Sequence, residues 1–358
     1  MYFYIPVKIY EEENCINVHK KELSSLGTKA LLVTGRRSSR LNGSLDDVIK
    51  ALESEGRTCT VFDEIEENPS IETVMAARDA GLAAGADFVV GIGGGSPMDA
   101  AKAIALMMYH KEKDAHYLYE KDADSTALPV AAVPTTCGTG SEATPFAILT
   151  IHEKRTKSSL PHKIFPTLAL LDAKYLSTAP KRVLCDTAVD ALGHFIESYI
   201  NSNASDYSRM CVTEGLSVWS RSRDVLLGKR EAKLKDYRNM LNASTMAGMA
   251  ITHTGTSLPH GLSYYVTYEQ GTAHGKAIGR FLRGYLEAAG EKEREFILSS
   301  AGFDSLKDFE LFYETVCGKE PLSDALKETA AEGVLSSPEK LNNCPFPVDK
   351  DILYRIME

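Results

Sequence analysis

Four side chains in this sequence carry nitrogen or oxygen donors of the kind that divalent transition metals bind: Asp190, His194, His260 and His274. Asp190 and His194 are four residues apart in an apolar helical pattern over residues 183–200, so one helix face presents both to a single ion. His260 and His274 each precede a glycine. Three imidazoles and one carboxylate suit a divalent ion that keeps room for a substrate oxygen. A buried Asp–His pair without metal is the alternative that spacing leaves open.

A glycine-rich stretch over residues 91–99, GIGGGSPMD, offers a second kind of chemistry. It follows an apolar run and leads into a helical pattern over residues 100–107, with Pro97 suited to the first helical turn. Consecutive glycines let backbone N–H groups approach a phosphate at a positive helix end. The spacing fits neither the G-x-G-x-x-G fingerprint nor a P-loop, and a tight strand-to-helix turn is the alternative.

A second polar loop, PTTCGTGSE over residues 134–142, follows the next apolar run. In a parallel sheet both loops emerge at the carboxyl ends of their strands, the edge where ligands bind. Its hydroxyls and exposed backbone suit a ribose, a pyrophosphate or an amide. A surface turn rich in Ser and Thr is the competing interpretation.

The elements that must position these loops alternate between strands and helices in the first half of the chain. The predicted strands are residues 30–33, 59–62, 88–92, 130–133 and 168–171. Helices are predicted between them, one capped by Ser44 and stopped by Gly56, another running from Ile71 to near Gly85. This alternation is typical of a largely parallel, Rossmann-like sheet.

From about residue 179 onward the β-branched runs disappear and long helical patterns replace them. The predicted helices are residues 183–200, 206–227, 232–249, 273–289 and 305–316. We therefore expect an α/β nucleotide-binding domain over residues 1–178, an all-α domain over residues 179–358, and a cleft between them.

The composition disfavours nucleic acid and membranes as partners and leaves small molecules as the expected ones. The 358 residues carry a formal charge of -9, so no basic field favours nucleic acid or an anionic membrane surface. No apolar stretch approaches the ~20 residues that span a bilayer, and the start lacks an export signal, so we expect a cytoplasmic protein. Seven scattered cysteines without a C-x-x-C pair indicate reduced thiols.

Taken together, these motifs resemble those of the iron-containing (group III) alcohol dehydrogenases. Residues 93–102 match that family's GGGSxxDxxK motif, residues 134–142 its PTTxGTGSE loop, and residues 190–197 its DALxHxxE helix. His260 and His274 fall where the family keeps its last two metal ligands. The matches run in order from about residue 68 to residue 275.

The resemblance implies a dehydroquinate synthase-like architecture and a metal held by Asp190, His194, His260 and His274. Iron is the family's usual metal, and the ligand set also suits zinc. The nucleotide contacts that carry over are Gly94, Gly95 and Ser96 at the pyrophosphate, Asp99 at the nicotinamide ribose, and Thr135, Thr136 and Thr139 at the nicotinamide side. Lys157 matches a lysine that lies close to the cofactor in relatives.

One departure concerns proton transfer. Many relatives carry a histidine four residues after the third ligand, where this chain has Tyr264. Proton relay must therefore differ, with Tyr264 and His253 as the candidates. A tyrosine with its ordinary pKa of about 10 is a reluctant base, and a packed tyrosine is the alternative interpretation.

The loop after the first strand of the α/β pattern indicates NADP(H) rather than NAD(H). NAD enzymes usually place an acid there, whereas residues 34–40 read TGRRSSR. A glycine, hydroxyls and guanidinium groups suit a 2′-phosphate, and the predicted contacts are Gly35, Arg36, Ser38, Ser39 and Arg40. A solvated basic loop is the alternative.

The expected activity is hydride transfer between NAD(P)(H) and a small primary alcohol or aldehyde, with the metal polarising the substrate oxygen. Two alternatives are a dehydroquinate synthase-like lyase or cyclase and a non-catalytic nucleotide- or metal-binding protein. We also expect a homodimer, because a strand near residues 3–7 could extend a sheet across a two-fold axis.

Overall fold

The computed structural model describes residues 2–358 and divides the chain into two compact units. The sheet unit comprises Ile5–Thr136 and Ser141–Ala179. The helical unit comprises Pro180–Glu358, joined by the residues that precede Ile5 and by Cys137–Gly140. The second polar loop therefore has its middle in the helical unit and both of its ends in the sheet unit.

The sheet unit is built on six parallel strands in the order β1-β8-β5-β4-β2-β3. The strands are β1 (Lys8–Glu11), β2 (Lys29–Thr34), β3 (Thr58–Phe62), β4 (Phe88–Gly93), β5 (Val130–Pro134) and β8 (Leu168–Leu171). The predicted parallel, Rossmann-like sheet is confirmed. Because β3 pairs outside β2 whereas β4, β5 and β8 build in the opposite direction, the winding reverses between β2 and β4. Ligands bind at such a switch point, and the glycine loop after β4 begins there. The second polar loop begins one strand further on, after β5.

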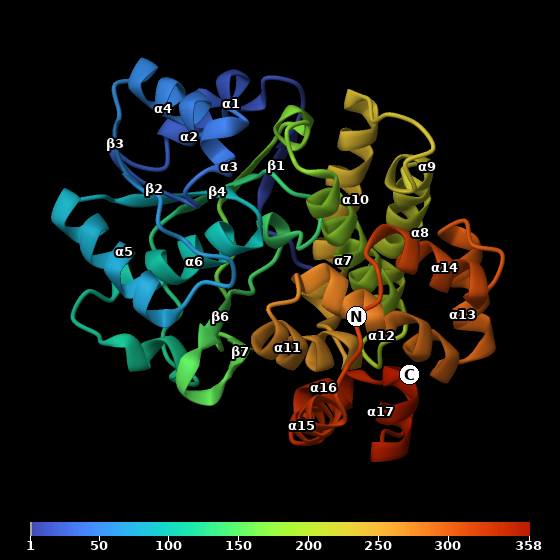
Figure 1. The fold of residues 1–358 in the computed structure, drawn as a ribbon. Coiled ribbons are helices and arrows are strands. Elements are labelled where there is room, and N and C mark those ends of the chain that lie inside the picture. Colours follow the sequence, from blue (N-terminus) through green and yellow to red (C-terminus); the bar gives the residue numbers. More distant parts are fainter. Residues whose placement is uncertain (1) are drawn as a thin grey trace. The chain divides into compact units, whose positions relative to one another are not determined.

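Helices cover both faces of this sheet (Figure 1). They are α1 (Cys15–Val18), α2 (Lys20–Ser24), α3 (Ser38–Leu41), α4 (Ser44–Ser54), α5 (Ile71–Ala84) and α6 (Gly95–Tyr109). Alternate β2 residues face opposite cores, so Leu31 packs with the α5 and α6 side chains while Leu32 packs with α1 and α4. Burial on both faces explains why these strands read as continuous apolar runs.

Two local predictions in this unit are corrected. Ser44 is the first residue of α4 rather than its cap, because Gly43 takes the N-cap position in the left-handed region at φ 81°. Residues 3–7 form no strand; β1 begins at Lys8 and pairs in parallel with β8 of the same chain. A hairpin of β6 (Ile148–Ile151) and β7 (Thr156–Ser159) was not predicted.

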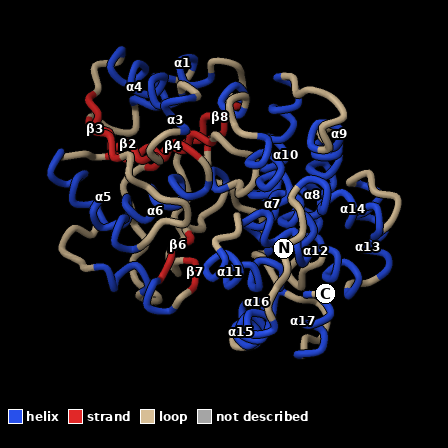
Figure 2. Tube along the Cα trace, in the orientation of Figure 1, coloured by secondary structure: helices blue, strands red, loops and turns tan. Residues whose placement is uncertain are grey.

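Within residues 2–358, the helical unit contains no strand (Figure 2). Its first helices are α7 (Lys181–Tyr199), α8 (Asp206–Ser220), α9 (Arg223–Leu226), α10 (Leu234–Thr254) and α11 (Leu258–Gln270). The remaining ones are α12 (His274–Ala288), α13 (Glu291–Ser300), α14 (Leu306–Val316), α15 (Asp324–Leu335), α16 (Pro338–Asn343) and α17 (Lys350–Met357). The prediction of one helix over residues 206–227 is wrong: a turn from Trp219 to Ser222 separates α8 from α9 and lets Val225 and Leu226 become buried.

Residues 2–358 contain no membrane-spanning helix and no disulfide. Among the helices of residues 2–358, none combines the length and the apolar character that crossing a bilayer requires. All seven cysteines lie within the described residues and carry free thiols.

Candidate active site

Helix α7 supplies the first two predicted metal ligands from its buried face. Asp190 and His194 are 2% and 4% exposed, and His194 Nε2 lies 3.8 Å from Asp190 Oδ1. The helix is buried along nearly its whole second half, so both polar groups sit among apolar neighbours. Such groups are costly to bury without a partner.

The other two predicted ligands come from the starts of α11 and α12. His260 follows Pro259 in the first turn of α11, and His274 is the first residue of α12. His260 Nε2 lies 2.9 Å from His194 Nε2 and 3.6 Å from Asp190 Oδ1. Donor atoms of Asp190, His260 and His274 all lie within 4.8 Å of one another. The structure thus brings the four predicted ligands together inside the helical unit.

Hydrogen bonds on the far side of two rings determine which nitrogens face this centre. His194 Nδ1 lies 3.2 Å from the carbonyl oxygen of Gly138, and His260 Nδ1 contacts Glu197 Oε2. Both partners accept, so each Nδ1 carries a proton and donates it. The unprotonated Nε2 atoms of His194 and His260 therefore direct their lone pairs toward each other and toward Asp190.

The charge of this centre suits a cation. Asp190 Oδ1 is buried and has no hydrogen-bond partner within residues 2–358. Burial opposes its ionisation, but the imidazoles around it hold the pKa of Asp190 well below the usual range. Burial lowers the pKa of His194 to about 4, which leaves a neutral imidazole ready to bind metal. An unpartnered carboxylate oxygen facing converging imidazole nitrogens fits a divalent metal.

Glu197 lies in the quoted α7 motif but was given no role by sequence reasoning, and the structure places it beside His260. It is fully buried, and its Oε1 accepts hydrogen bonds from the amides of Ser257 (2.8 Å) and His260 (3.2 Å). Burial opposes its ionisation, but His260 and Lys340 bring the pKa of Glu197 below its ordinary value. The signal was present in its spacing, since residues 190, 194 and 197 share one helix face.

The first glycine loop joins β4 to α6 with unusually close backbone packing. Gly93 has φ 149°, where a side chain would meet Pro97 Cγ at 2.7 Å, and a side chain on Gly94 would come within 3.0 Å of Thr136 Oγ1. Gly94 is the N-cap of α6 and provides no side-chain cap, so the amides that begin at Gly95 remain available. A bare helix N-terminus of this kind fits a phosphate.

Two polar side chains of this loop are held by the surrounding protein. The Ser96 hydroxyl accepts a hydrogen bond from the amide of Asn68 at 3.1 Å. Asn68 also accepts from Lys157 Nζ at 3.0 Å, so predicted cofactor residues 96 and 157 meet at one asparagine. Lys157 lies on β7, and that hairpin explains how a residue so distant in sequence reaches the loop.

A buried lysine connects α6 to the second polar loop. Lys102 is fully buried, and its Nζ donates to Ser141 Oγ (2.7 Å) and to the carbonyl oxygen of Phe146 (2.7 Å). Ser141 in turn donates to Asp99 Oδ1 at 2.5 Å, and the amide of Ile148 donates to Asp99 Oδ2. Burial lowers the pKa of Lys102 to about 8. Asp99, predicted to face the nicotinamide ribose, is therefore already held by protein donors.

The remaining second-loop residues occupy different surroundings. Thr135 is buried, and its amide donates to the carbonyl oxygen of Gly93 at 2.8 Å. Thr136 lies beside Gly94, in the sheet unit. Thr139 belongs to Cys137–Gly140, where a side chain on Gly138 would come within 2.9 Å of Asp190 Oδ2. This loop therefore contacts both the glycine loop and the metal ligands.

The predicted contacts of the 2′-phosphate, in the loop after β2, differ in how exposed they are. Arg36 and Ser38 are exposed, and among residues 2–358 Arg36 makes no hydrogen bond or ion pair. Arg40 pairs with Asp63 at 2.8 Å, and Gly35 is half-buried. Ser39 is fully buried and accepts from Thr34 Oγ1 at 2.7 Å, so in this conformation its hydroxyl faces the protein.

The two proton-relay candidates lie in different places. The Tyr264 ring stacks on His274 with ring centroids 6.0 Å apart. His253 instead accepts from the amide of Tyr4 at its Nε2 (3.0 Å), donates from Nδ1 to the carbonyl of Met249 (2.8 Å), and stacks on Phe3. Of the two, Tyr264 is the one in contact with a predicted ligand.

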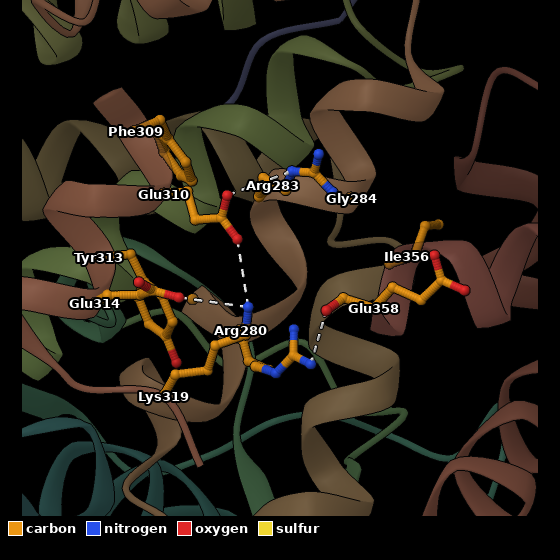
Figure 3. A pocket seen from close by; sticks show the side chains of 11 residues that line it. Arg280, Arg283, Gly284, Phe309, Glu310, Tyr313, Glu314, Lys319, Ile356 and Glu358 are labelled. Carbon is orange, nitrogen blue, oxygen red and sulfur yellow. Dashed lines mark hydrogen bonds and ion pairs between the residues drawn. The ribbon is translucent and has the colours of Figure 1, made fainter. Parts of the chain in front are cut away.

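A cavity between α12, α14 and α17 lies outside this constellation (Figure 3). It holds about 10 Å³, roughly one water. Lys319 there lies 3.3 Å from Glu310 and 3.4 Å from Glu314, and Arg280 donates to the carbonyl oxygen of Met357. It offers no room for an organic ligand.

Comparison with known proteins identifies the family of both units. The family model for iron-containing alcohol dehydrogenase matches residues 6–173, and the model for the C-terminal part of the Fe-containing alcohol dehydrogenase family matches residues 184–299. The chain is 31% identical to long-chain-alcohol dehydrogenase 1 of Geobacillus thermodenitrificans, over 82% of this chain and 76% of that protein.

Two further relatives differ in how much of their length is shared. Aldehyde-alcohol dehydrogenase 2 of Entamoeba histolytica is 30% identical over 83% of this chain, which covers only 35% of that protein. A crystal structure of an iron-containing alcohol dehydrogenase from Thermotoga maritima is 34% identical, covers 99% of this chain and 98% of its own, and superposes with a TM-score of 0.92. The chain belongs to the iron-containing alcohol dehydrogenase family of oxidoreductases.

Proposed function

We propose that this protein interconverts small primary alcohols and aldehydes by hydride transfer, with a divalent metal and NADP(H). The observation that carries the proposal is the buried, unpartnered Asp190 Oδ1, which faces Nε2 atoms of His194 and His260. A carboxylate left in this way among imidazoles is costly unless a cation completes the set. Iron is the metal we propose first on family grounds, with zinc as the alternative that the same donors accept.

Different residues of the chain are proposed to hold the metal, to bind the nucleotide and to transfer the proton. When bound, a divalent ion supplies Lewis-acid polarisation of a substrate oxygen, and a nicotinamide supplies or accepts the hydride. Asp190 and the three histidines hold the ion, while Gly138 and Glu197 keep the Nδ1 protons of His194 and His260 in place. The start of α6 receives the pyrophosphate, and Tyr264 is the proposed proton relay because its ring lies against His274.

An uncharged substrate is proposed because the charged groups beside the ligands are already engaged. Glu197 accepts three hydrogen bonds from the start of α11, and Lys340, which lies over the Tyr264 ring, donates to Thr256 Oγ1 at 2.6 Å. A phosphorylated or carboxylated substrate would need free cations in this position. This argument favours an alcohol dehydrogenase over a lyase of the dehydroquinate synthase type.

NADP(H) is proposed over NAD(H) from the loop that follows β2. Arg36 is exposed and unpaired within the described chain, and Ser38 is exposed next to it. No acid stands in residues 34–40 to accept from a ribose hydroxyl or to repel a phosphate. Arg40 contributes less, because Asp63 already neutralises it.

A homodimer is proposed from the sheet. β1 pairs with β8 alone among the strands of residues 2–358, so its other edge can accept a strand of a second copy. A sedimentation mass near twice the 39.2 kDa of one chain supports this, and a monomer at micromolar concentration contradicts it.

The activity is tested by an absorbance assay at 340 nm. Purified protein is stripped of metal, reloaded with iron or zinc, and mixed with NADPH or NADH and a panel of aldehydes of increasing chain length. We expect metal-dependent NADPH oxidation with at least one short aldehyde. No turnover with any aldehyde, while both metal and nucleotide bind, would identify a non-catalytic binding protein instead.

A further inference from the structure

Glu197 occupies a position that the four-ligand description leaves without a role. It follows Asp190 and His194 on the same face of α7, one further turn along the helix. Its side chain is fully buried, which is a costly arrangement for a carboxylate in a protein interior. A charge buried at that cost needs specific partners.

All three donors that contact the Glu197 carboxylate come from the start of α11. Oε1 accepts from the amides of Ser257 at 2.8 Å and His260 at 3.2 Å, and Oε2 accepts from His260 Nδ1. Glu197 therefore holds His260 at two points, through its backbone and through its ring. Rotation of the His260 ring would break the hydrogen bond from Nδ1 to Oε2, while the hydrogen bond from the His260 amide to Oε1 would stay in place.

We propose that Glu197 is a positioning residue that keeps the proton of His260 on Nδ1 and so directs Nε2 at the metal. The inference rests on the proposed metal centre and adds a residue that acts through His260. Its physical basis is that a carboxylate can only accept, so the nitrogen that faces it must donate. Partners of this kind fix the tautomer and orientation of a metal-binding histidine.

The substitution Glu197→Gln separates this role from simple packing. Glutamine has nearly the same size, and its carbonyl oxygen can still accept from the amides of Ser257 and His260. Its NH₂ group then takes the place of Oε2 and presents a donor to His260 Nδ1. To satisfy that donor, the imidazole must move its proton to Nε2, where the proton occupies the position that the metal requires.

The experiment is a metal titration of the purified full chain in competition with a chelator of known zinc affinity. Wild type, Glu197→Gln and Asp186→Asn are compared, and the melting temperature of each metal-free protein is recorded. Asp186 is the matched control, because it is another buried carboxylate on α7 and receives the same chemical change. We expect Glu197→Gln to weaken zinc binding roughly 10- to 100-fold, while Asp186→Asn stays within about twofold of wild type.

Two outcomes would overturn the inference. One is a zinc affinity of Glu197→Gln equal to that of wild type; the other is an equal loss in both variants. A lower melting temperature without a change in zinc affinity would assign Glu197 to packing alone. If Glu197→Gln fails to fold, Glu197→Asp provides the test, since it keeps the acceptor but withdraws it by one methylene and should weaken zinc binding less. Failure of wild type to bind zinc at all would instead contradict the proposed function.

Discussion

The metal ligands of the helical unit and the phosphate loop of the sheet unit differ in how far the protein alone satisfies them. In the helical unit, Asp190 Oδ1 has no hydrogen-bond partner within residues 2–358, and two Nε2 atoms lie 2.9 Å apart. In the sheet unit, Ser96, Asp99 and Lys102 all have hydrogen-bond partners. The first arrangement suits a cation, whereas the second leaves backbone amides at the start of α6 available to a ligand. The proposed metal centre is thus built from side chains whose donor atoms face one another, and the proposed phosphate site from side chains that hold bare backbone in position.

The largest effect is expected from removing a ligand. His260→Ala deletes one Nε2 and also leaves Glu197 buried without its ring partner. Turnover with added metal should fall by more than about 100-fold, the upper end of what loss of a supporting partner costs. Metal content measured by elemental analysis should fall with it. Full activity together with full metal occupancy would show that the ligands are misassigned.

The second effect concerns the side chains that hold the phosphate loop. Lys102→Met removes the ammonium from a buried network and should cost about 3 kcal/mol, because its partners stay buried. For a unit of this size that corresponds to a melting temperature lower by roughly 6–12 °C. The measurement is thermal unfolding at pH 7, with metal content as the control. Loss of metal at the same time would contradict the separation of the two regions.

The same lysine gives a pH dependence whose sign is defined. Burial lowers the pKa of Lys102 from 10.5 to about 8, so between these values the unfolded chain binds the proton that the folded chain lacks. Stability then rises with pH, by about 1.4 kcal/mol per unit between roughly pH 8 and pH 10. The melting-temperature deficit of Lys102→Met should therefore widen from pH 7 to pH 9.5. A constant deficit would show that Lys102 does not titrate in that window.

A smaller and more selective effect is expected at the loop after β2. Arg36→Ala should raise the KM for NADPH about tenfold, or about 1.4 kcal/mol, and leave the KM for NADH unchanged. Arg40→Ala should have the weaker effect, because Asp63 already pairs with Arg40. Steady-state kinetics with both cofactors provide the measurement. A wild-type preference for NADH, or equal use of the two, would disprove the NADP(H) assignment.

The smallest effect is expected at His253. Both of its ring nitrogens are engaged, with Tyr4 and Met249, so it has no position left for a substrate proton. His253→Ala should keep kcat within about twofold of wild type, the scale of a change outside the site. Tyr264→Phe is the comparison, since that hydroxyl belongs to the proposed relay. A larger loss of kcat in His253→Ala than in Tyr264→Phe would reverse the two roles.

Sequence reasoning succeeded where a residue's position follows from local periodicity. The strands from β2 to β5 are apolar runs with helices between them, and α7 carries Asp190 and His194 at a spacing that shows directly on one helix face. The parallel sheet then placed both polar loops at one edge. For these reasons the fold could be inferred before the structure, and so could the clustering of the four predicted ligands, whose binding of a metal stays a prediction.

Sequence reasoning failed where tertiary packing determines the outcome. α11 begins with Pro259 and contains Gly261 and β-branched residues, so its pattern is weak, although it positions His260. The β6–β7 hairpin, which brings Lys157 to Asn68, is held by contacts distant in sequence. Burial of Ser39 and the ion pair of Arg40 with Asp63 could not be read from a loop rich in Ser and Arg. The role of Glu197 required the direction of a hydrogen bond.

Hydrogen exchange of the full chain with and without zinc tests the contrast between the two regions most directly. Zinc binds the facing donor atoms of the proposed metal centre, so amide exchange should slow in the second half of α7 and in the first turns of α11 and α12. Exchange at the start of α6 and in β5 should stay the same with zinc and slow only when NADPH is added. Equal slowing of both regions by zinc, or no slowing at α7, α11 and α12, would contradict the account.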